Sequence, residues 1–295
     1  MTWPAAEVDV DEDLVRALLA EQHSDLSELS LAQIDAGFDN TLWRLGDEFL
    51  VRLPRRELAG PLILNEQRWL PALAPRLPLP IPNPVRIGRP SGRYPWSWSI
   101  APWLEGIPGD RAVITEPEDA ADRLGRFLRA LHVSAPPEAP HNEFRGVGLS
   151  HRAGNFERRV AALGTEIDLD GAQRVWDRGL SADAWSGPPV WVHGDLHPAN
   201  ILFLSGTVAA IIDFGDLCAG DPATDLAAAW MVLPSTAMAA FREAYGGIDA
   251  ALGHRSLAWA VLFALIFLEL GLGGRTTYET IGRATLASST ACVAR

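Results

Sequence analysis

Lysine is absent from this sequence, because all 25 basic residues are arginine. Arginine keeps its charge under almost all conditions, so mechanisms that need a lysine Schiff base, a lysine general base or a P-loop lysine are excluded. Cysteine is also scarce, with only Cys218 and Cys292. Two cysteines give no disulfide framework, and we therefore expect free thiols in a reducing cytoplasm.

Positive charge is in short supply, since the net charge is −12 and the isoelectric point is near 5.0. This balance predicts no nucleic-acid partner, because phosphates need a basic face, and it favours a cationic ligand. The acidic N-terminal segment "MTWPAAEVDVDEDLV" lacks the basic and apolar blocks of a signal peptide. We therefore expect a cytoplasmic protein.

Long apolar runs are missing as well. The uninterrupted run from Leu257 to Leu268 is shorter than the ~20 residues that a membrane-spanning helix needs, and Glu269 ends it. The run therefore predicts a buried core helix, and we expect no membrane partner.

Hydrophobic periodicity divides the 295 residues into a smaller β-rich part, residues 1–105, and a larger, mostly helical part, residues 106–295. In the first part, Gly46-Asp47 predicts a tight turn between two strands. A proline-dense connector, residues 75–92, must run extended. The other segments predicted there are 11–22 (helix), 30–37 and 40–56 (strands), 63–74 (helix) and 94–106 (strand and linker).

The second part reads as helices interrupted by short strands. The predicted helices are 118–134, 154–167, 170–180 and the whole stretch from Pro222 onwards. Apolar runs on both sides of residue 195 and before residue 213 predict the short strands. Together the two parts predict an α+β fold.

The stretch "WVHGDLHPANILF", residues 191–203, places several polar residues between two apolar strands. His193 and His197 have the spacing of two zinc ligands on one helix face. Gly194 and Pro198 are unfavourable for a continuous helix, however, and no third histidine or cysteine is near. A turn whose polar groups only satisfy the backbone is the second interpretation. It is weakened because a second acidic cluster, "IIDFGD", follows the next apolar strand.

Phosphoryl transfer is the third interpretation. It needs a carboxylate that orients and deprotonates the attacking hydroxyl, and oxygen ligands that hold Mg²⁺ against the nucleotide phosphates. Asp195, Asn200 and Asp213 are oxygen donors at strand ends or in the loop between them. Their order, D-x-x-x-x-N followed by D-F-G, is the order of the kinase catalytic core.

The segments "VHGDLHPANIL" and "IIDFGDLCAGDPATDLA" resemble the aminoglycoside phosphotransferase family, bacterial relatives of protein kinases. The resemblance implies a two-lobed, protein-kinase-like fold with a small β-rich N-lobe, a larger helical C-lobe, and ATP or GTP between them. It implies that Asp195 is the catalytic base and that Asn200 and Asp213 bind Mg²⁺. His193 then supports the loop, and Asp225 buttresses it. His197 is interpreted as shaping the loop.

A kinase also needs a nucleotide cradle in its first part. The G-x-G-x-x-G loop is absent, and a reduced loop with Gly37 and Asn40 is expected in its place. Arg52 stands where kinases use a lysine, and Glu66 is its expected partner. A guanidinium can hold phosphates bidentately. Where the two parts join, Pro102 has no N–H, so the backbone donor to the base is expected to be Trp103 or a neighbour.

The acceptor is expected to be a small molecule that carries a hydroxyl group. Only eleven residues separate Asp213 from Asp225, and no A-P-E motif follows, so a peptide platform is missing. Asp216 and Glu269 are the acidic candidates for the acceptor pocket, and the aromatic candidates are Trp230, Tyr245 and Trp259. An acidic pocket would suit a cationic aminoglycoside, the leading candidate, which implies antibiotic resistance.

Other acceptors stay open, because the family's members also phosphorylate macrolides, choline, homoserine and other sugars, and nucleoside antibiotics and amino sugars are further candidates. Two alternatives of other classes are a nucleotide-binding pseudokinase and a metal-dependent hydrolase that uses the same aspartates with water as the nucleophile.

Overall fold

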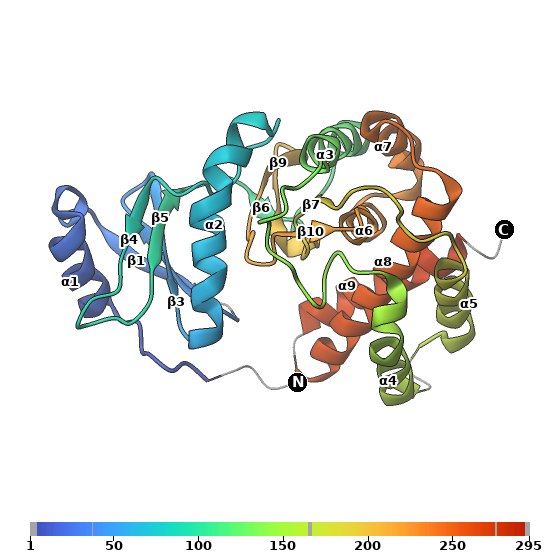
Figure 1. Cartoon of the computed structure of the whole chain (residues 1–295), viewed down its shortest axis with the longest axis horizontal. Helices are drawn as coiled ribbons and strands as arrows, with labels where there is room; N and C mark the ends of the chain where they lie inside the picture. The colour runs from blue at the N-terminus through green and yellow to red at the C-terminus, as the bar shows by residue number, and fades with distance from the viewer. Residues whose placement is uncertain (1–4, 37, 165–166, 275, 293–295) are drawn as a thin grey trace.

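The computed structural model describes residues 5–36, 38–164, 167–274 and 276–292. Figure 1 shows two lobes, a smaller one with most of the strands and a larger one made mostly of helices. The elements of the smaller lobe are α1 (Glu12–Gln22), β1 (Leu31–Ala36), β2 (Asn40–Leu45), β3 (Phe49–Pro54), α2 (Gly60–Leu73), β4 (Arg86–Gly88) and β5 (Trp98–Pro102).

The larger lobe contains the elements that follow β5. Its helices are α3 (Pro117–Leu131), α4 (Ala153–Leu163), α5 (Leu169–Leu180), α6 (Ala223–Val232), α7 (Met238–Tyr245), α8 (Ala250–Leu272) and α9 (Thr276–Ala291). Its strands are β6 (Ile107–Pro108), β7 (Val190–Val192), β8 (Ile201–Leu204), β9 (Thr207–Ile211) and β10 (Cys218–Gly220). Short 3₁₀ helices in the two lobes are η1 (Ser24–Leu26), η2 (Glu57–Ala59), η3 (Ala74–Arg76), η4 (Leu149–Arg152), η6 (Pro198–Asn200) and η7 (Ser235–Ala237).

The smaller lobe is built on a five-stranded antiparallel sheet of order β1-β2-β3-β5-β4. The predicted turn between β2 and β3 is confirmed, and Gly46 there has φ +57°, a conformation that favours glycine. Alternate residues of β2 are buried, as expected for a strand with one face on a core. In Figure 1 the sheet lies between α1 and α2, and α2 is on the side of the larger lobe.

The larger lobe is organised around α8, which packs against α5, α6 and α9. Among the described residues, α8 is the one helix long and apolar enough to cross a membrane, but 78% of its most apolar window is buried inside the protein. The apolar run therefore forms the core helix that the sequence predicts.

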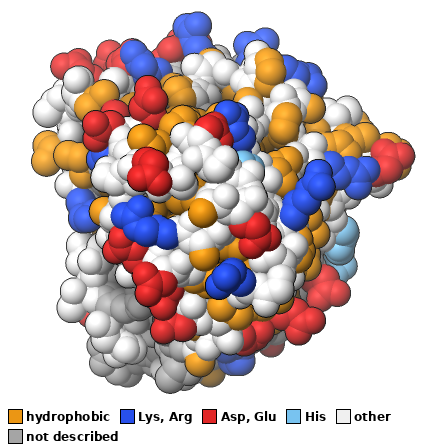
Figure 2. All heavy atoms as spheres, turned by 90° about the vertical axis from the view of Figure 1, so that its left-hand side faces the viewer, with side chains coloured by type: hydrophobic (Ala, Val, Ile, Leu, Met, Phe, Trp, Pro, Cys, Tyr) orange, Lys and Arg blue, Asp and Glu red, His pale blue; other side chains and the backbone are white. Residues whose placement is uncertain are grey.

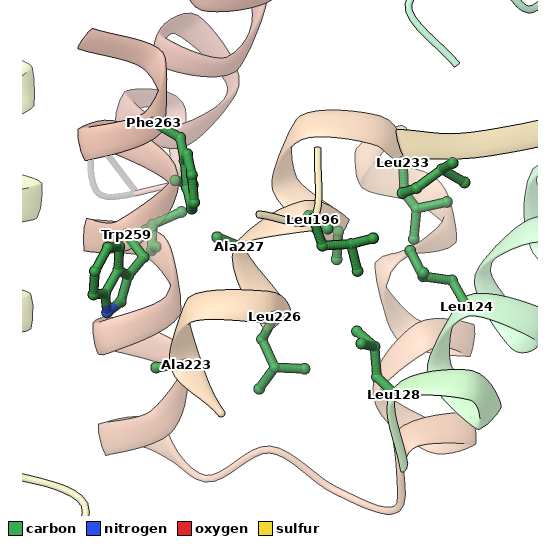
Figure 3. Packing of buried hydrophobic residues seen from close by; sticks show 14 of the residues in the cluster. Leu124, Leu128, Leu196, Ala223, Leu226, Ala227, Leu233, Trp259 and Phe263 are labelled. Atoms are coloured by element: carbon green, nitrogen blue, oxygen red, sulfur yellow. The ribbon is translucent and has the colours of Figure 1, made fainter. Parts of the chain in front are cut away.

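Two hairpin-like pairings hold the central polar stretch in place. Strands β7 and β10 pair antiparallel, and β8 pairs with β9. The Ile212 N–H donates to the Asn200 carbonyl at 2.9 Å, so the residues just before β8 lie beside those just after β9. Leu196 is fully buried, and Figure 3 shows it among core residues of α6 and α3, including Leu226 and Leu128. The polar loop is thus anchored in the apolar core.

Some features differ from the sequence prediction. The helix predicted at 63–74 begins earlier, at Gly60, because Pro61 is well suited to a first helical turn. Strands β4, β6 and β10 were not predicted, since each has only two or three residues. The division at residue 105 stays a prediction. Leu70 and Leu73 of α2, which precede that boundary, belong to the same buried apolar core as residues of α3, α6 and α8.

Figure 2 shows the end of the molecule formed by the smaller lobe, where arginine side chains alternate with aspartate and glutamate. One exposed pair of this lobe is Arg16 and Glu12, 2.8 Å apart on α1. Exposed pairs of this kind contribute at most about 1 kcal/mol each. The stability of this lobe therefore depends mainly on its sheet and on its apolar core, which includes Leu18, Trp43 and Ile100.

Candidate active site

The loop after β7 begins with a glycine that no other residue could replace without strain. Gly194 has φ +86°, and a Cβ added there would lie 2.5 Å from the Asp216 carbonyl oxygen. The preceding residue, His193, is fully buried. Its Nδ1 accepts from the Asp195 N–H at 3.3 Å, and its Nε2 lies 3.0 Å from the Ile212 carbonyl. Both ring nitrogens are thus engaged, which argues against the zinc interpretation.

Asp225, in the first turn of α6, holds the same loop from behind. One of its oxygens accepts from the His193 N–H at 2.6 Å, and the other accepts from the Gly194 N–H at 2.9 Å. His132 Nε2 lies 3.2 Å from Asp225 Oδ2. The carboxylate is fully buried, so these partners replace the water that it would otherwise bind. The buttress position expected for Asp225 is where the structure places it.

Asp195 projects from this loop and stays partly open, with 28% of its side chain exposed. Arg145 Nη2 donates to its Oδ1 at 2.9 Å, and His197 Nε2 lies 3.5 Å from its Oδ2. Burial alone would raise the pKa of Asp195, but the Arg145 charge and the histidine outweigh this effect and hold the pKa below its usual range. The carboxylate is therefore ionised and can accept a hydrogen bond from a substrate hydroxyl.

Asn200 and Asp213 are the two residues expected to bind Mg²⁺. The Asn200 amide nitrogen donates to the Asp195 carbonyl at 2.9 Å, which leaves its side-chain oxygen as the atom for a cation. Asp213 has φ +62°, and 53% of its side chain is exposed. Positive φ is uncommon for residues other than glycine and often marks functional sites. The turn after β9 thus aims a carboxylate outward.

These two oxygens fit Mg²⁺. Among the described residues, no group of three or more histidine, cysteine, aspartate or glutamate side chains is arranged to hold a metal ion. Mg²⁺ usually takes only one or two protein ligands and completes its coordination with phosphate oxygens and water. A bound Mg²⁺ would neutralise charge on the transferred phosphoryl group. Asn200 and Asp213 are the residues that would hold it.

Arg52 connects the sheet of the smaller lobe to this turn. Its Nη1 donates to both Glu66 oxygens, at 2.9 and 2.7 Å, and its Nη2 donates to Asp213 Oδ1 at 3.3 Å. Arg52 and Glu66 are 5% and 1% exposed. Burial would lower the pKa of Arg52, but the two carboxylates raise it above its usual value. The expected pair of β3 and α2 is therefore formed, and it is joined to Asp213.

The other residues expected to contact the nucleotide are Trp103, Asn40 and Gly37. The Trp103 N–H donates to the Glu48 carbonyl at 2.7 Å. This hydrogen bond continues the pairing of β3 with β5, so the amide is not free for a base, and the expectation for Trp103 is corrected. Asn40 begins β2, and its side-chain oxygen is buried without a partner among the described residues. Gly37 lies outside the described residues.

Of the expected acceptor residues, Asp216 lies against the loop, since its carbonyl oxygen would be 2.5 Å from a Cβ at Gly194. Asp216 accepts from Asn142 at 2.7 Å, and burial together with the Asp195 charge raises its pKa. Glu269 is paired with Arg159 at 3.2 Å. Trp230 instead contacts neighbouring helices: its indole donates to Ser256 of α8, and Arg242 of α7 lies over its ring. These contacts indicate a packing role for Trp230.

Three residues near Asp195 were not found by sequence reasoning. Arg145 lies in the segment between α3 and η4, and no motif marks it. Phe263 of α8 packs under the Arg145 guanidinium at 5.0 Å, and Phe267, one turn later, packs edge-on against His197 at 5.2 Å. Their spacing is that of residues on one helix face. That face was predictable as apolar, but its proximity to the loop was not.

A family model for the phosphotransferase enzyme family matches residues 30–260. The chain belongs to this family. The match covers every residue of the catalytic loop and of the Asp213 turn, together with Arg52, Glu66 and Asp225.

Among curated proteins, this chain is similar to two homoserine kinases. The one from Methylocella silvestris is 30% identical over 180 residues, which cover 53% of this chain and 50% of that protein. The one from Rhizobium johnstonii is 27% identical over 234 residues, which cover 72% of this chain and 67% of that protein. The chain therefore aligns with about half of the first relative and two thirds of the second.

Solved structures show the same kinase-like fold. The GDP complex of wild-type aminoglycoside 2'-phosphotransferase-IIIa superposes with a TM-score of 0.72 at 18% identity, covering 96% of this chain and 100% of that one. A macrolide 2'-phosphotransferase type I superposes with a TM-score of 0.64 at 24% identity, covering 96% and 99%. The predicted two-lobed α+β fold is thus confirmed.

Proposed function

We propose that this phosphotransferase is a magnesium-dependent kinase that moves the γ-phosphoryl group of ATP or GTP to a hydroxyl of a small molecule. In this reaction the acceptor oxygen bonds to the γ-phosphorus, the bond from phosphorus to the β,γ-bridging oxygen breaks, and the nucleoside diphosphate leaves. The hydroxyl proton passes to Asp195. Asn200 and Asp213 hold the metal ion, and Arg52 contacts the phosphates.

The observation that carries this proposal is the link between Arg52 and Asp213. The arginine comes from the sheet of one lobe and the aspartate from the turn after β9 in the other, and they meet at 3.3 Å. Glu66 fixes the arginine through two further hydrogen bonds. Phosphoryl transfer requires a cation and a metal-binding carboxylate aligned on one nucleotide, and a pseudokinase would not need both.

The acceptor is proposed only as a class. Relatives named for homoserine, aminoglycosides and macrolides support two kinds of acceptor, an amino-acid hydroxyl and an antibiotic hydroxyl. The acidic pocket expected for a cationic aminoglycoside has limited support, because Glu269 already pairs with Arg158 and Arg159. An aminoglycoside, and with it antibiotic resistance, remains one candidate to be tested.

Variants of the two aspartates test the proposal. Asp195→Ala should lower kcat at least 100-fold, the lower range for removing a positioned base, while nucleotide affinity stays unchanged. Asp213→Ala should weaken Mg²⁺-dependent nucleotide binding. ATP and GTP consumption, measured with panels of aminoglycosides, macrolides, amino sugars and hydroxy amino acids, gives the turnover. Calorimetry gives the binding.

The same assay separates the alternatives. Acceptor-independent release of inorganic phosphate that needs Asp195 would indicate the hydrolase instead. Nucleotide binding without turnover of any acceptor would indicate the pseudokinase. Full activity of Asp195→Ala would show that this carboxylate is not the base.

A further inference from the structure

Arginines gather beside the catalytic loop of this otherwise acidic chain. Of the 25 arginines in a protein of net charge −12, four lie in one short segment that includes η4 and the start of α4; they are Arg145, Arg152, Arg158 and Arg159. Like charges so close together repel one another. The cluster therefore needs counter-anions.

Three of the four arginines have such anions within the protein. Arg145 pairs with Asp195 at 2.9 Å. On α4, Arg159 lies 3.2 Å from Glu269, and Arg158 lies 3.9 Å from the same carboxylate. The two carboxylates that pair with these arginines, Asp195 and Glu269, are thus already engaged.

Arg152 has no such partner. It is only 5% exposed, yet its guanidinium forms no hydrogen bond or ion pair within the described residues, and its Nε is buried without an acceptor. Its guanidinium carbon lies 5.2 Å from the centre of the Phe144 ring. Burial and the charges of the other three arginines lower the pKa of Arg152 to about 10. The group is still charged near neutral pH, and a buried unpaired charge is costly.

The position of Arg152 relates it to the catalytic centre. Phe144, which it contacts, is the sequence neighbour of Arg145, and Arg145 touches Asp195. Arg145 is also the first of the neighbouring charges that act on Arg152. The nucleotide is expected to bind at Arg52, on the side of the smaller lobe. An anion bound by Arg152 would therefore lie on the acceptor side of the catalytic loop.

We propose that the phosphoryl acceptor carries an anionic group, which a carboxylate or a phosphate could supply, and that Arg152 binds this group while the acceptor hydroxyl lies at Asp195. The proposal rests on the kinase function proposed above and specifies its substrate class. A guanidinium matches a carboxylate or a phosphate bidentately, and the ligand would supply the counter-anion that the protein does not. A purely cationic acceptor would leave Arg152 unpaired and would meet like charge.

The test uses matched acceptors and matched variants of the full-length protein. Short hydroxy acids and hydroxy amino acids are each compared with their carboxamides, and sugar phosphates with the parent sugars, in the presence of Mg²⁺ and ATP or GTP. The enzymes are the wild type, Arg152→Gln, and Arg174→Gln, which removes a charge from an exposed position on α5.

Arg152→Gln should lower kcat/KM for the anionic acceptor about 10- to 100-fold, the range for a hydrogen bond to a charged group, and should act mainly on KM. It should leave the poor turnover of the neutral counterpart unchanged, and Arg174→Gln should affect neither. A preference for the carboxylates or for the sugar phosphates identifies the anionic group of the natural acceptor. Equal turnover of the acid and its carboxamide by the wild type and by Arg152→Gln would overturn the proposal.

Thermal unfolding supplies the second readout. Since Arg152 lacks a partner, Arg152→Met should not lower Tm without ligand, whereas a structural residue would; a marked loss of Tm together with a uniform loss of all activities would overturn the proposal. Anionic acceptors should raise the Tm of the wild type but not of Arg152→Gln. If that shift occurs without phosphorylation of any compound, the anion site stands and the kinase function fails. If neither occurs, both fail.

Discussion

The ion pair between Arg52 and Glu66 allows a quantitative test of the nucleotide cradle. Both side chains are almost fully buried, and two hydrogen bonds of 2.9 and 2.7 Å join them. Removing one partner of such a pair leaves the other charge buried without compensation. Replacing both with apolar residues of similar size removes the desolvation cost together with the attraction.

The structure therefore predicts a strong coupling between the two positions. Arg52→Met should lower the free energy of unfolding by about 3–5 kcal/mol, because Glu66 is stranded. Glu66→Leu should cost somewhat less, since Arg52 keeps its 3.3 Å contact with Asp213. The double variant should lie within about 1–2 kcal/mol of the wild type. The coupling energy would then be several kcal/mol, far above what surface pairs give.

Urea unfolding, followed by tryptophan fluorescence, measures the stability of the four proteins, and calorimetry with Mg²⁺ and ATP or GTP measures nucleotide binding. The double variant should be stable and yet bind nucleotide poorly, because no lysine in the chain can replace Arg52. This separation of stability from binding is the decisive result. If Arg52→Met cost less than about 1 kcal/mol and bound nucleotide normally, the pair would be a solvated surface contact, and the reasoning would fail.

Two further predictions concern the catalytic loop. Asp225→Ala should lower the free energy of unfolding by about 2–6 kcal/mol, since two buried N–H groups lose their acceptor at about 1–3 kcal/mol each; urea unfolding measures this, and unchanged stability would contradict the buttress. Gly194→Ala should sharply reduce kcat, because the added Cβ would lie 2.5 Å from the Asp216 carbonyl at φ +86°. Gly92→Ala, with open space around it, is the matched control, and equal turnover of the two variants would refute the argument.

Local signals explain why so much of the loop could be predicted. Asp195, Asn200 and Asp213 lie within one strand-loop-hairpin unit, so their spacing in sequence nearly fixes their spacing in space. The pairing of β8 with β9 then brings Asn200 beside the residue before Asp213. Asp225 was predicted only through the family resemblance, and it lies in the first turn of α6. Short motifs carry geometry when one small supersecondary unit contains them.

The hinge and the acceptor wall depend on packing between distant segments. Trp103 was expected to offer its N–H, but the register of β3 against β5 directs that group to Glu48. A register is decided by the whole sheet and cannot be read from one strand. Arg145, 50 residues before Asp195 in the chain, reaches it only because of how the lobe packs. No local pattern distinguishes such an arginine from a solvated one.

This protein has no lysine, and two of its buried arginines, Arg52 and Arg152, differ in whether a carboxylate pairs with them. Arg52 is buried with carboxylates that the fold supplies, so its charge is satisfied before any ligand arrives. Arg152 is equally buried but pairs with no carboxylate of the described residues. A fold tolerates an uncompensated charge only where another gain offsets its cost. Arg152 contacts Phe144, the chain neighbour of the arginine that touches Asp195, so that gain is best sought in the acceptor.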